Sequence, residues 1–99
     1  MPLFILATKV STNLTEDLSE REALGEKWLN EIKTKCPDAK FLHHWALLGP
    51  YDFIDVFEAP DHETALKVSL LTKSAGATFA ETWTAIAYKH FLKLTQEIS

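Results

Sequence analysis

Apolar residues are concentrated in short segments that have the character of strands. Residues 3–10 form a continuous apolar run with a β-branched end, which is typical of a strand buried on both faces. Residues 40–48 and 51–58 are rich in aromatic and β-branched side chains, and the Gly-Pro pair between them favours a turn. Residues 78–87, rich in Thr, Phe and Trp, have the same character. The pattern predicts four strands, the middle two of which form a β-hairpin.

Two longer segments carry the periodicity of amphipathic helices. Between residues 17 and 35 the apolar positions recur about every four residues, which predicts a helix. Gly25 inside it costs roughly 1 kcal/mol relative to alanine, so we expect the helix to approach a sheet closely there. A second helix is predicted from Asp61, a favourable N-cap residue, to Gly76, a favourable C-terminal stop. The tail also has helical spacing and predicts a short closing helix, at Phe91, Leu94 and Ile98.

The predicted order of elements is β-α-β-β-α-β over residues 1–99, with no linker or repeat that would divide the chain. This is the order of the split βαβ, or ferredoxin-like, plait. The expected fold class is therefore α+β: a four-stranded antiparallel sheet with two helices on one face, in a single domain. One face of such a sheet is bare, and its residues decide whether the subunit needs a partner.

The residues on each face follow from the pairing expected across the hairpin. With Leu48 opposite Tyr51, alternation places His44 opposite Asp55. Side chains of one face are then Leu42, His44, Ala46, Leu48, Tyr51, Phe53, Asp55 and Phe57, and those of the other are His43, Trp45, Leu47, Asp52, Ile54, Val56 and Glu58.

The second of these faces is assigned to the helix side. Ile54 and Val56 favour this assignment because β-branched residues pack well beneath helices, and Trp45 then belongs to the core. The other face leaves an aromatic set exposed in an isolated subunit: Tyr51, Phe53 and Phe57. A contiguous aromatic patch of this kind marks a partner surface. The expected partner is a second copy, sheet against sheet, in a homodimer or higher homo-oligomer.

The hairpin turn and the segment after it resemble a known family. Gly49-Pro50-Tyr51-Asp52, followed by Glu58-Ala59-Pro60-Asp61, is similar to the GYD domain family, named for its Gly-x-Tyr-Asp turn. The resemblance continues to Gly76 and to Glu81-Thr82, at the position of the family's Thr-x-Thr strand motif, and covers most of the chain. It implies a ferredoxin-like subunit of the dimeric α/β-barrel group. That group includes cofactor-free oxygenases, haem proteins of the chlorite-dismutase type, small hydrolase-like proteins and proteins that only bind or assemble.

The amino-acid composition limits the classes of molecule that the protein is expected to bind. The chain has 99 residues, 46% of them hydrophobic, which is enough for one core. The 10 Lys and Arg against 14 Asp and Glu, for a net charge of -4, argue against binding to nucleic acid. No apolar run approaches the roughly 20 residues of a membrane span. The apolar segment at residues 3–7 lacks the basic start of a secretory signal. We therefore expect a cytoplasmic protein that binds neither nucleic acid nor membrane.

His44 and Asp55 are the candidate chemistry of the predicted bare face. The Cβ atoms of a directly opposed pair lie about 4.5–5.5 Å apart. A carboxylate beside an imidazole raises the imidazole pKa and fixes its tautomer, as a general base requires. A register slip of one residue would instead place His43 opposite Asp55. The structural alternative to catalysis is a pair that only stabilises a dimer interface.

An apolar cavity between two subunits is expected around this pair. Its walls are the candidate ligand-binding residues: Leu42, Tyr51, Phe53, Phe57 and Trp83. If the side chains of its strand alternate the other way, Trp83 lies instead in the core between the helices and the sheet. Adjacent strand residues point to opposite faces, so His43 and His44 cannot chelate one ion. The lone Cys36 excludes a thiolate-rich site. We expect no metal and no bound cofactor.

Two classes of function are open. The first is a small dimeric domain that binds a small, largely apolar molecule or serves as an assembly module. The alternative is a cofactor-free enzyme of the oxygenase or lyase type, with His44 and Asp55 as catalytic residues in the inter-subunit cavity. The first is favoured, because an enzyme of this fold would be expected to show more convergent polar groups.

Overall fold

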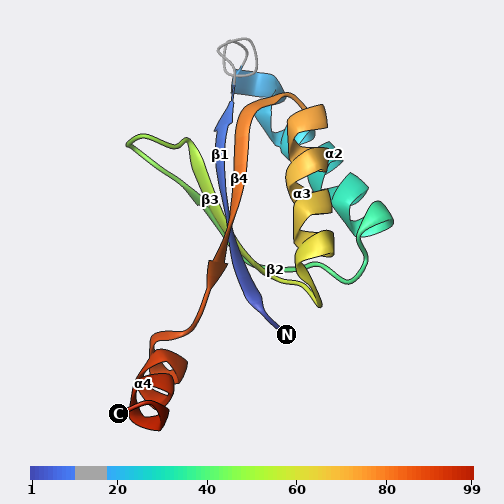
Figure 1. The fold of residues 1–99 in the computed structure, drawn as a ribbon. Coiled ribbons are helices and arrows are strands. Elements are labelled where there is room, and N and C mark those ends of the chain that lie inside the picture. Colours follow the sequence, from blue (N-terminus) through green and yellow to red (C-terminus); the bar gives the residue numbers. More distant parts are fainter. Residues whose placement is uncertain (11–17) are drawn as a thin grey trace.

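The computed structural model describes residues 1–10 and 18–99, which form four strands and four helical segments (Figure 1). In chain order they are β1 (Leu3–Val10), the 3-10 helix η1 (Leu18–Glu20), α2 (Arg21–Lys35), β2 (Lys40–Ala46), β3 (Phe53–Glu58), α3 (His62–Ser74), β4 (Ala77–Ala85) and α4 (Tyr88–Glu97). The strands form one antiparallel sheet in the order β2-β3-β1-β4. The chain therefore has the predicted α+β fold with a four-stranded antiparallel sheet.

Local sequence signals set the ends of the helices. The Asp61 carboxylate accepts a hydrogen bond from the backbone N–H of Thr64 at 2.8 Å, so α3 has its predicted N-cap. Gly76, just after α3, has a φ of 110°, which L side chains rarely adopt, and this confirms it as the helix stop. The predicted start of the first long helix at Asp17 lies outside the described residues. Within them, α2 follows η1 at Arg21.

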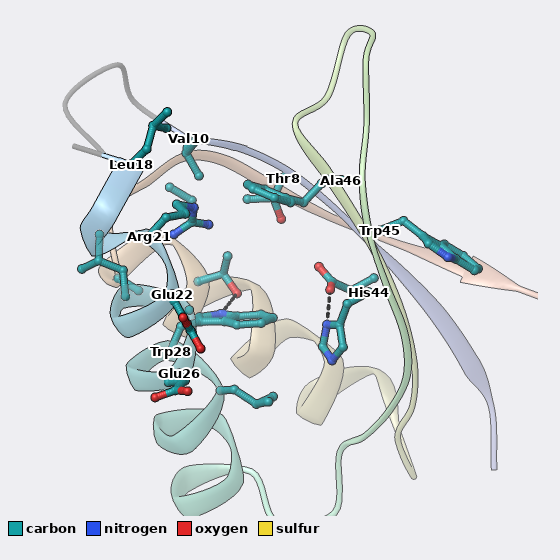
Figure 2. Close-up of a pocket in the computed structure, with 18 residues that line it drawn as sticks. Thr8, Val10, Leu18, Arg21, Glu22, Glu26, Trp28, His44, Trp45 and Ala46 are labelled. Carbon is teal, nitrogen blue, oxygen red and sulfur yellow. Dashed lines mark hydrogen bonds and ion pairs between the residues drawn. The ribbon is translucent and has the colours of Figure 1, made fainter. Parts of the chain in front are cut away.

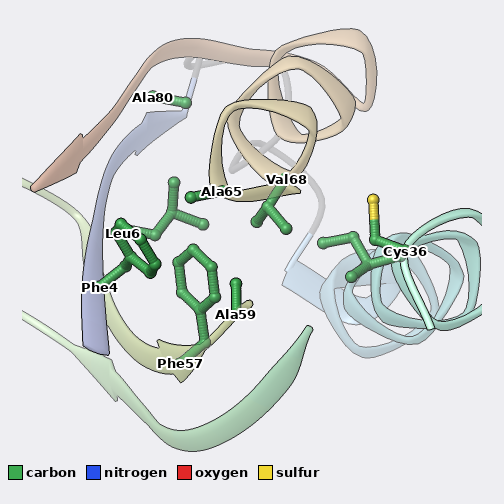
Figure 3. Packing of buried hydrophobic residues seen from close by; sticks show 9 residues of the cluster. Phe4, Leu6, Cys36, Phe57, Ala59, Ala65, Val68 and Ala80 are labelled. Carbon is green, nitrogen blue, oxygen red and sulfur yellow. The ribbon is translucent and has the colours of Figure 1, made fainter. Parts of the chain in front are cut away.

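The core lies between the sheet and the layer formed by α2 and α3, which cover the same face of the sheet (Figure 1). Leu6 of β1, Phe57 of β3, Ile32 of α2 and Val68 of α3 are fully buried in one cluster (Figure 3). The rings of Phe57 and Phe4 stack with their centroids 5.6 Å apart. Removal of this apolar surface from water is the main favourable contribution to folding.

The half of the hairpin nearer the turn has the predicted pairing, but the two faces of the hairpin are the reverse of the prediction. His44 lies opposite Asp55, and Ala46 lies opposite Phe53, as expected from the position of the turn. Phe57, however, is fully buried beneath the helices instead of exposed on the bare face. Phe53 and Asp55 also point to the helix side, because side chains alternate along a strand.

Aromatic packing explains the reversal. The rings of Phe4, Phe57 and Phe41 stack in succession, with centroids 5.6 and 5.1 Å apart, and pack between the strands and the helices at one end of the sheet. Ile54 and Val56, predicted beneath the helices, therefore lie on the opposite face. A β-branched side chain fits either face of a pleated sheet, so its shape could not decide between them.

A β-bulge in β2 changes the partner expected for Phe57. Between Phe41 and His43 the register shifts by one residue, so Phe41 lies opposite Phe57. Leu42 is the extra residue and is exposed, rather than paired with Phe57. The bulge also lets Phe41 and His44 point to the same face, although three positions separate them along the chain.

We refer to the face of the sheet away from α2 and α3 as the open face. Trp45, predicted in the core, is 51% exposed on this face, and its ring stacks on that of His43. Trp83, for which two positions were open, also lies here and meets the ring of Tyr51 edge-on. The large side chains of the open face come from all four strands and the hairpin connection: Ile5, His43, Trp45, Tyr51, Ile54, Val56, Phe79 and Trp83.

The last helix, α4, stands apart from the rest of the subunit (Figure 1). It has the helical spacing predicted for the tail, but it does not close the subunit, because none of its residues is buried. It lies on the side of the sheet away from α2 and α3, and its Tyr88, Phe91 and Leu92 side chains are exposed. No described helix, α4 included, is long and apolar enough to cross a membrane.

Candidate functional site

His44 of β2 and Asp55 of β3 meet on the helix-covered face of the sheet (Figure 2). The His44 Nδ1 and Asp55 Oδ1 atoms are 2.5 Å apart. Asp55 is buried, whereas the His44 side chain is 46% exposed. The register therefore brings the two predicted residues together, with the carboxylate inside the subunit and the imidazole at the margin of its interior.

The surroundings of Asp55 disfavour its ionised form. Burial raises the pKa of the Asp55 carboxyl, and the hydrogen bond and charge of His44 offset this shift only in part. When Asp55 is ionised, its carboxylate accepts the Nδ1–H of His44. That hydrogen bond fixes the tautomer in which the His44 Nε2 is an acceptor.

Aromatic side chains fix the plane of the imidazole. The His44 ring stacks on Phe41, with centroids 5.2 Å apart and planes 11° from parallel. Trp28 of α2 meets it edge-on, at a centroid distance of 6.1 Å. The Trp28 Nε1 donates a hydrogen bond to the Thr72 hydroxyl of α3 at 2.9 Å. Groups from β2, α2 and α3 thus hold the His44 ring in place directly or through Trp28.

A cavity of about 690 Å³ lies between α2 and the sheet, with His44 and Asp55 in its wall (Figure 2). A cavity was predicted around this pair between two subunits. This one lies inside a single subunit, because the face that carries His44 is the face covered by helices. The guanidinium of Arg21 lies over the ring of Phe53 at 4.9 Å, also in the wall.

Gly25 of α2 lines the same cavity. The sequence predicted that this glycine allows a close approach of helix and sheet. That prediction is wrong, because a Cβ placed on Gly25 would meet no atom within 4 Å. The missing side chain leaves open space beside the sheet instead of relieving a contact.

The other predicted ligand-binding residues are divided among several places. Phe53 lines the cavity with His44 and Asp55. Phe57 is in the core, and Leu42 is exposed at the bulge. The remaining two, Tyr51 and Trp83, contact each other on the open face. The predicted set is therefore split between the two faces of the sheet.

The sequence reasoning did not connect α2 with the His44–Asp55 pair. Trp28 of α2 packs against the core and also forms part of the cavity wall. A signal was available in the spacing of Arg21, Leu24, Gly25 and Trp28, which places all four on one helix face. An arginine and a glycine within an apolar stripe indicate that the stripe is incompletely packed.

The Gly49-Pro50-Tyr51-Asp52 turn joins the hairpin to the rest of the sheet. The Asp52 carboxylate accepts a hydrogen bond from the backbone N–H of Val10 at 2.9 Å, at the end of β1. The Tyr51 ring packs on Trp83 and so reaches across the open face to β4. The motif therefore has a structural role, because it ties the β2–β3 hairpin to both β1 and β4.

The described residues hold no cluster of three or more His, Cys, Asp or Glu side chains that could bind a metal ion. His43 and His44 point to opposite faces, since His43 stacks on Trp45 of the open face. Cys36 is buried, and burial raises the pKa of its thiol, which disfavours the reactive thiolate.

Comparison with known proteins decides the family. The match to the GYD domain family extends over residues 4–95. The chain belongs to the GYD domain family. The resemblance drawn from the Gly-x-Tyr-Asp turn is thereby confirmed.

One curated protein similar in sequence and two solved structures similar in fold are also found. The "glutamine synthetase and cystathionine beta-lyase binding protein" of Thermus thermophilus is 32% identical over 89 residues, covering 87% of this chain and 90% of its own. The crystal structure of TTHA0845, also from Thermus thermophilus, has a TM-score of 0.57 at 20% identity, covering 88% of this chain and 95% of that one. MtbAldR has a TM-score of 0.60 at 15% identity, covering 87% of this chain but only 53% of that longer chain. The two crystal structures show a likeness in fold alone.

Proposed function

We propose that this GYD domain is a binding and assembly module that works as a homodimer, joined through the open face of its sheet. The observation that carries this proposal is the open face itself. Its large apolar side chains come from all four strands, and no described element of the chain covers them. Contiguous apolar patches larger than a few hundred Å² are rare on monomers and mark interaction surfaces.

A second copy is the partner that best fits this face. In a two-fold dimer the same patch serves both subunits, and two sheets pack face to face about 10 Å apart. The strand order β2-β3-β1-β4, with α2 and α3 on one face, agrees with a ferredoxin-like plait. Two such plaits packed sheet to sheet, with their helices outside, form a dimeric α/β barrel.

The isolated helix α4 supports the same arrangement. Its apolar residues Tyr88, Phe91 and Leu92 follow helical spacing along one stripe, and Lys89 and Lys93 lie together on one flank of that stripe. A helix this short is marginal in water unless its apolar stripe is packed. Because α4 lies on the open side of the sheet, a subunit docked there would offer a surface to that stripe.

The relative from Thermus thermophilus supports a binding role for the assembled dimer. Its name describes a protein that binds two enzymes. We propose by analogy that the dimer of this chain presents a surface to other proteins. The cofactor-free oxygenase or lyase activity expected as an alternative required His44 and Asp55 between subunits, and no observation places them there.

Oligomeric state tests this proposal. The wild type should sediment as a dimer at micromolar concentration, and Ile54→Glu should sediment as a folded monomer, because it buries a charge in the centre of the interface. Leu66→Glu is the matched control, since Leu66 is 57% exposed on α3, away from the open face. It should remain a dimer. Circular dichroism checks that each variant is folded. A monomeric wild type would overturn the proposal.

A further inference from the structure

We propose that the cavity between α2 and the sheet binds a small, neutral, largely apolar molecule whose hydroxyl group donates a hydrogen bond to the Nε2 of His44. This inference concerns the helix-covered side of the sheet, and it does not depend on the dimer proposed above.

The size and walls of the cavity suit such a molecule. Its volume of about 690 Å³ is in the range of small-molecule sites, which span roughly 300–1,000 Å³ and are mostly apolar with a few placed polar groups. Apolar walls come from both sides of the cavity: Leu24, Trp28 and Leu29 from α2, and Val10, Ala46 and Phe53 from the sheet. Flat aromatic surfaces such as Trp28 and Phe53 favour a flat ligand.

The polar groups in the wall differ in whether they can still form a hydrogen bond with a ligand. The Trp28 Nε1 and the Thr72 hydroxyl already bond to each other, and Thr72 also donates to the carbonyl of Val68. Asp55 is occupied by the Nδ1 of His44. The Nε2 of His44 has no hydrogen-bond partner among the described residues, and Figure 2 shows the ring directed into the space beside α2. With the Asp55 carboxylate accepting from Nδ1–H, Nε2 is an acceptor, so the ligand must donate.

Charge favours a neutral ligand over an anion. Glu22 and Glu26 of α2 and Asp55 of β3 stand in the wall against a single arginine. That arginine, Arg21, lies over the ring of Phe53. A carboxylate or phosphate would meet acidic groups without a cluster of cations to offset them. An alcohol or phenol is neutral, so the acidic groups do not repel it and it needs no cations to offset a charge.

Two probes test the proposal: a naphthalene with a hydroxyl donor, and the same ring with that hydroxyl capped as a methyl ether. We expect 1-naphthol to bind the wild type about five- to tenfold more tightly than 1-methoxynaphthalene, the effect of one neutral hydrogen bond. Isothermal titration calorimetry gives both affinities. Imidazole nitrogen NMR should show the His44 signals shifting on addition of 1-naphthol, while those of His43, on the opposite face, stay in place. Failure of both probes to bind at millimolar concentration would overturn the proposal.

Two variants with matched controls locate the site. Gly25→Leu places a side chain in open space within the cavity and should weaken both probes at least tenfold, whereas Gly25→Ala should weaken them much less. His44→Phe keeps a ring against Phe41 and should abolish the preference for 1-naphthol, whereas His43→Phe should keep it. An unchanged affinity in Gly25→Leu rules out this cavity, and an unchanged preference in His44→Phe rules out the hydrogen bond.

The monomeric variant separates this site from the dimer. Because the cavity lies within one subunit, Ile54→Glu should bind 1-naphthol as the wild type does. Loss of binding in that variant would place the probe between subunits and overturn this proposal while leaving the dimer intact. A monomeric wild type that still binds the probe in the cavity would instead overturn the dimer alone.

Discussion

The helix-covered face of the sheet buries Phe4, Leu6 and Phe57 against the chain's own helices, whereas the open face leaves Trp45 half exposed. Both faces are apolar and aromatic. They differ in that two helices cover the first, where stacked rings form the core, while no described element covers the second. The comparison shows that apolarity alone does not identify the core of a small sheet. What identifies it is the set of side chains whose shapes pack together.

The largest expected difference between the faces is in stability. Phe57→Ala should lower the free energy of unfolding by about 3–5 kcal/mol, since it leaves a cavity in the core. Trp45→Ala should lower it by less than about 1 kcal/mol, because the Trp45 side chain is 51% exposed and its ring stacks on the exposed His43. Urea unfolding of both variants in the monomeric Ile54→Glu background measures this contrast. Similar losses from the two substitutions would refute the assignment of the faces.

A smaller difference is expected in pH dependence, because the helix-covered face contains the buried Asp55. Its raised pKa means that the folded protein keeps a proton that the unfolded chain has released. The stability from this group is thus fully present below roughly pH 4, the ordinary aspartate pKa, and is lost as pH rises through the folded-state pKa. The difference in unfolding free energy between wild type and Asp55→Asn should therefore shift in favour of the variant as the pH rises above about 4. A difference that stays constant with pH would contradict this.

The smallest effect is expected at the margin of the helix-covered face, where α2 leaves space. Gly25→Ala should raise the free energy of unfolding by about 0.5–1 kcal/mol, because alanine has the higher helix propensity and its methyl group meets no neighbour. Gly76→Ala is the contrasting control and should destabilise, since Gly76 has a φ of 110°. Thermal unfolding followed by circular dichroism compares the two. A destabilised Gly25→Ala would mean that helix and sheet do approach closely there.

Much of the fold could be predicted because its signals are local. The apolar run of β1, the Gly-Pro turn and the Asp61 cap each act over a few residues, and the pairing of His44 with Asp55 follows from the turn. The faces could not be predicted in the same way. They depend on how Phe4, a residue of another strand, stacks on Phe57 across the sheet.

The candidate site was predicted only in part for the same reason. The two residues of the His44–Asp55 pair are close in sequence, so alternation along one hairpin brought them together. The cavity wall is built from α2, whose position relative to the sheet depends on packing throughout the subunit. Arg21 and Gly25 in the helix stripe indicate that it is incompletely packed, but the distance of that stripe from the sheet depends on contacts far away in the sequence.

The bulge at Leu42 has a consequence for solubility. β2 is an edge strand, and a long, regular, apolar edge is a template on which further chains can add strands and grow into fibrils. The extra residue interrupts the row of outward-facing backbone groups and increases the local twist, so a second chain cannot pair along the whole edge. Growth of the sheet sideways is thereby restricted in a protein whose aromatic strands would otherwise be prone to aggregate.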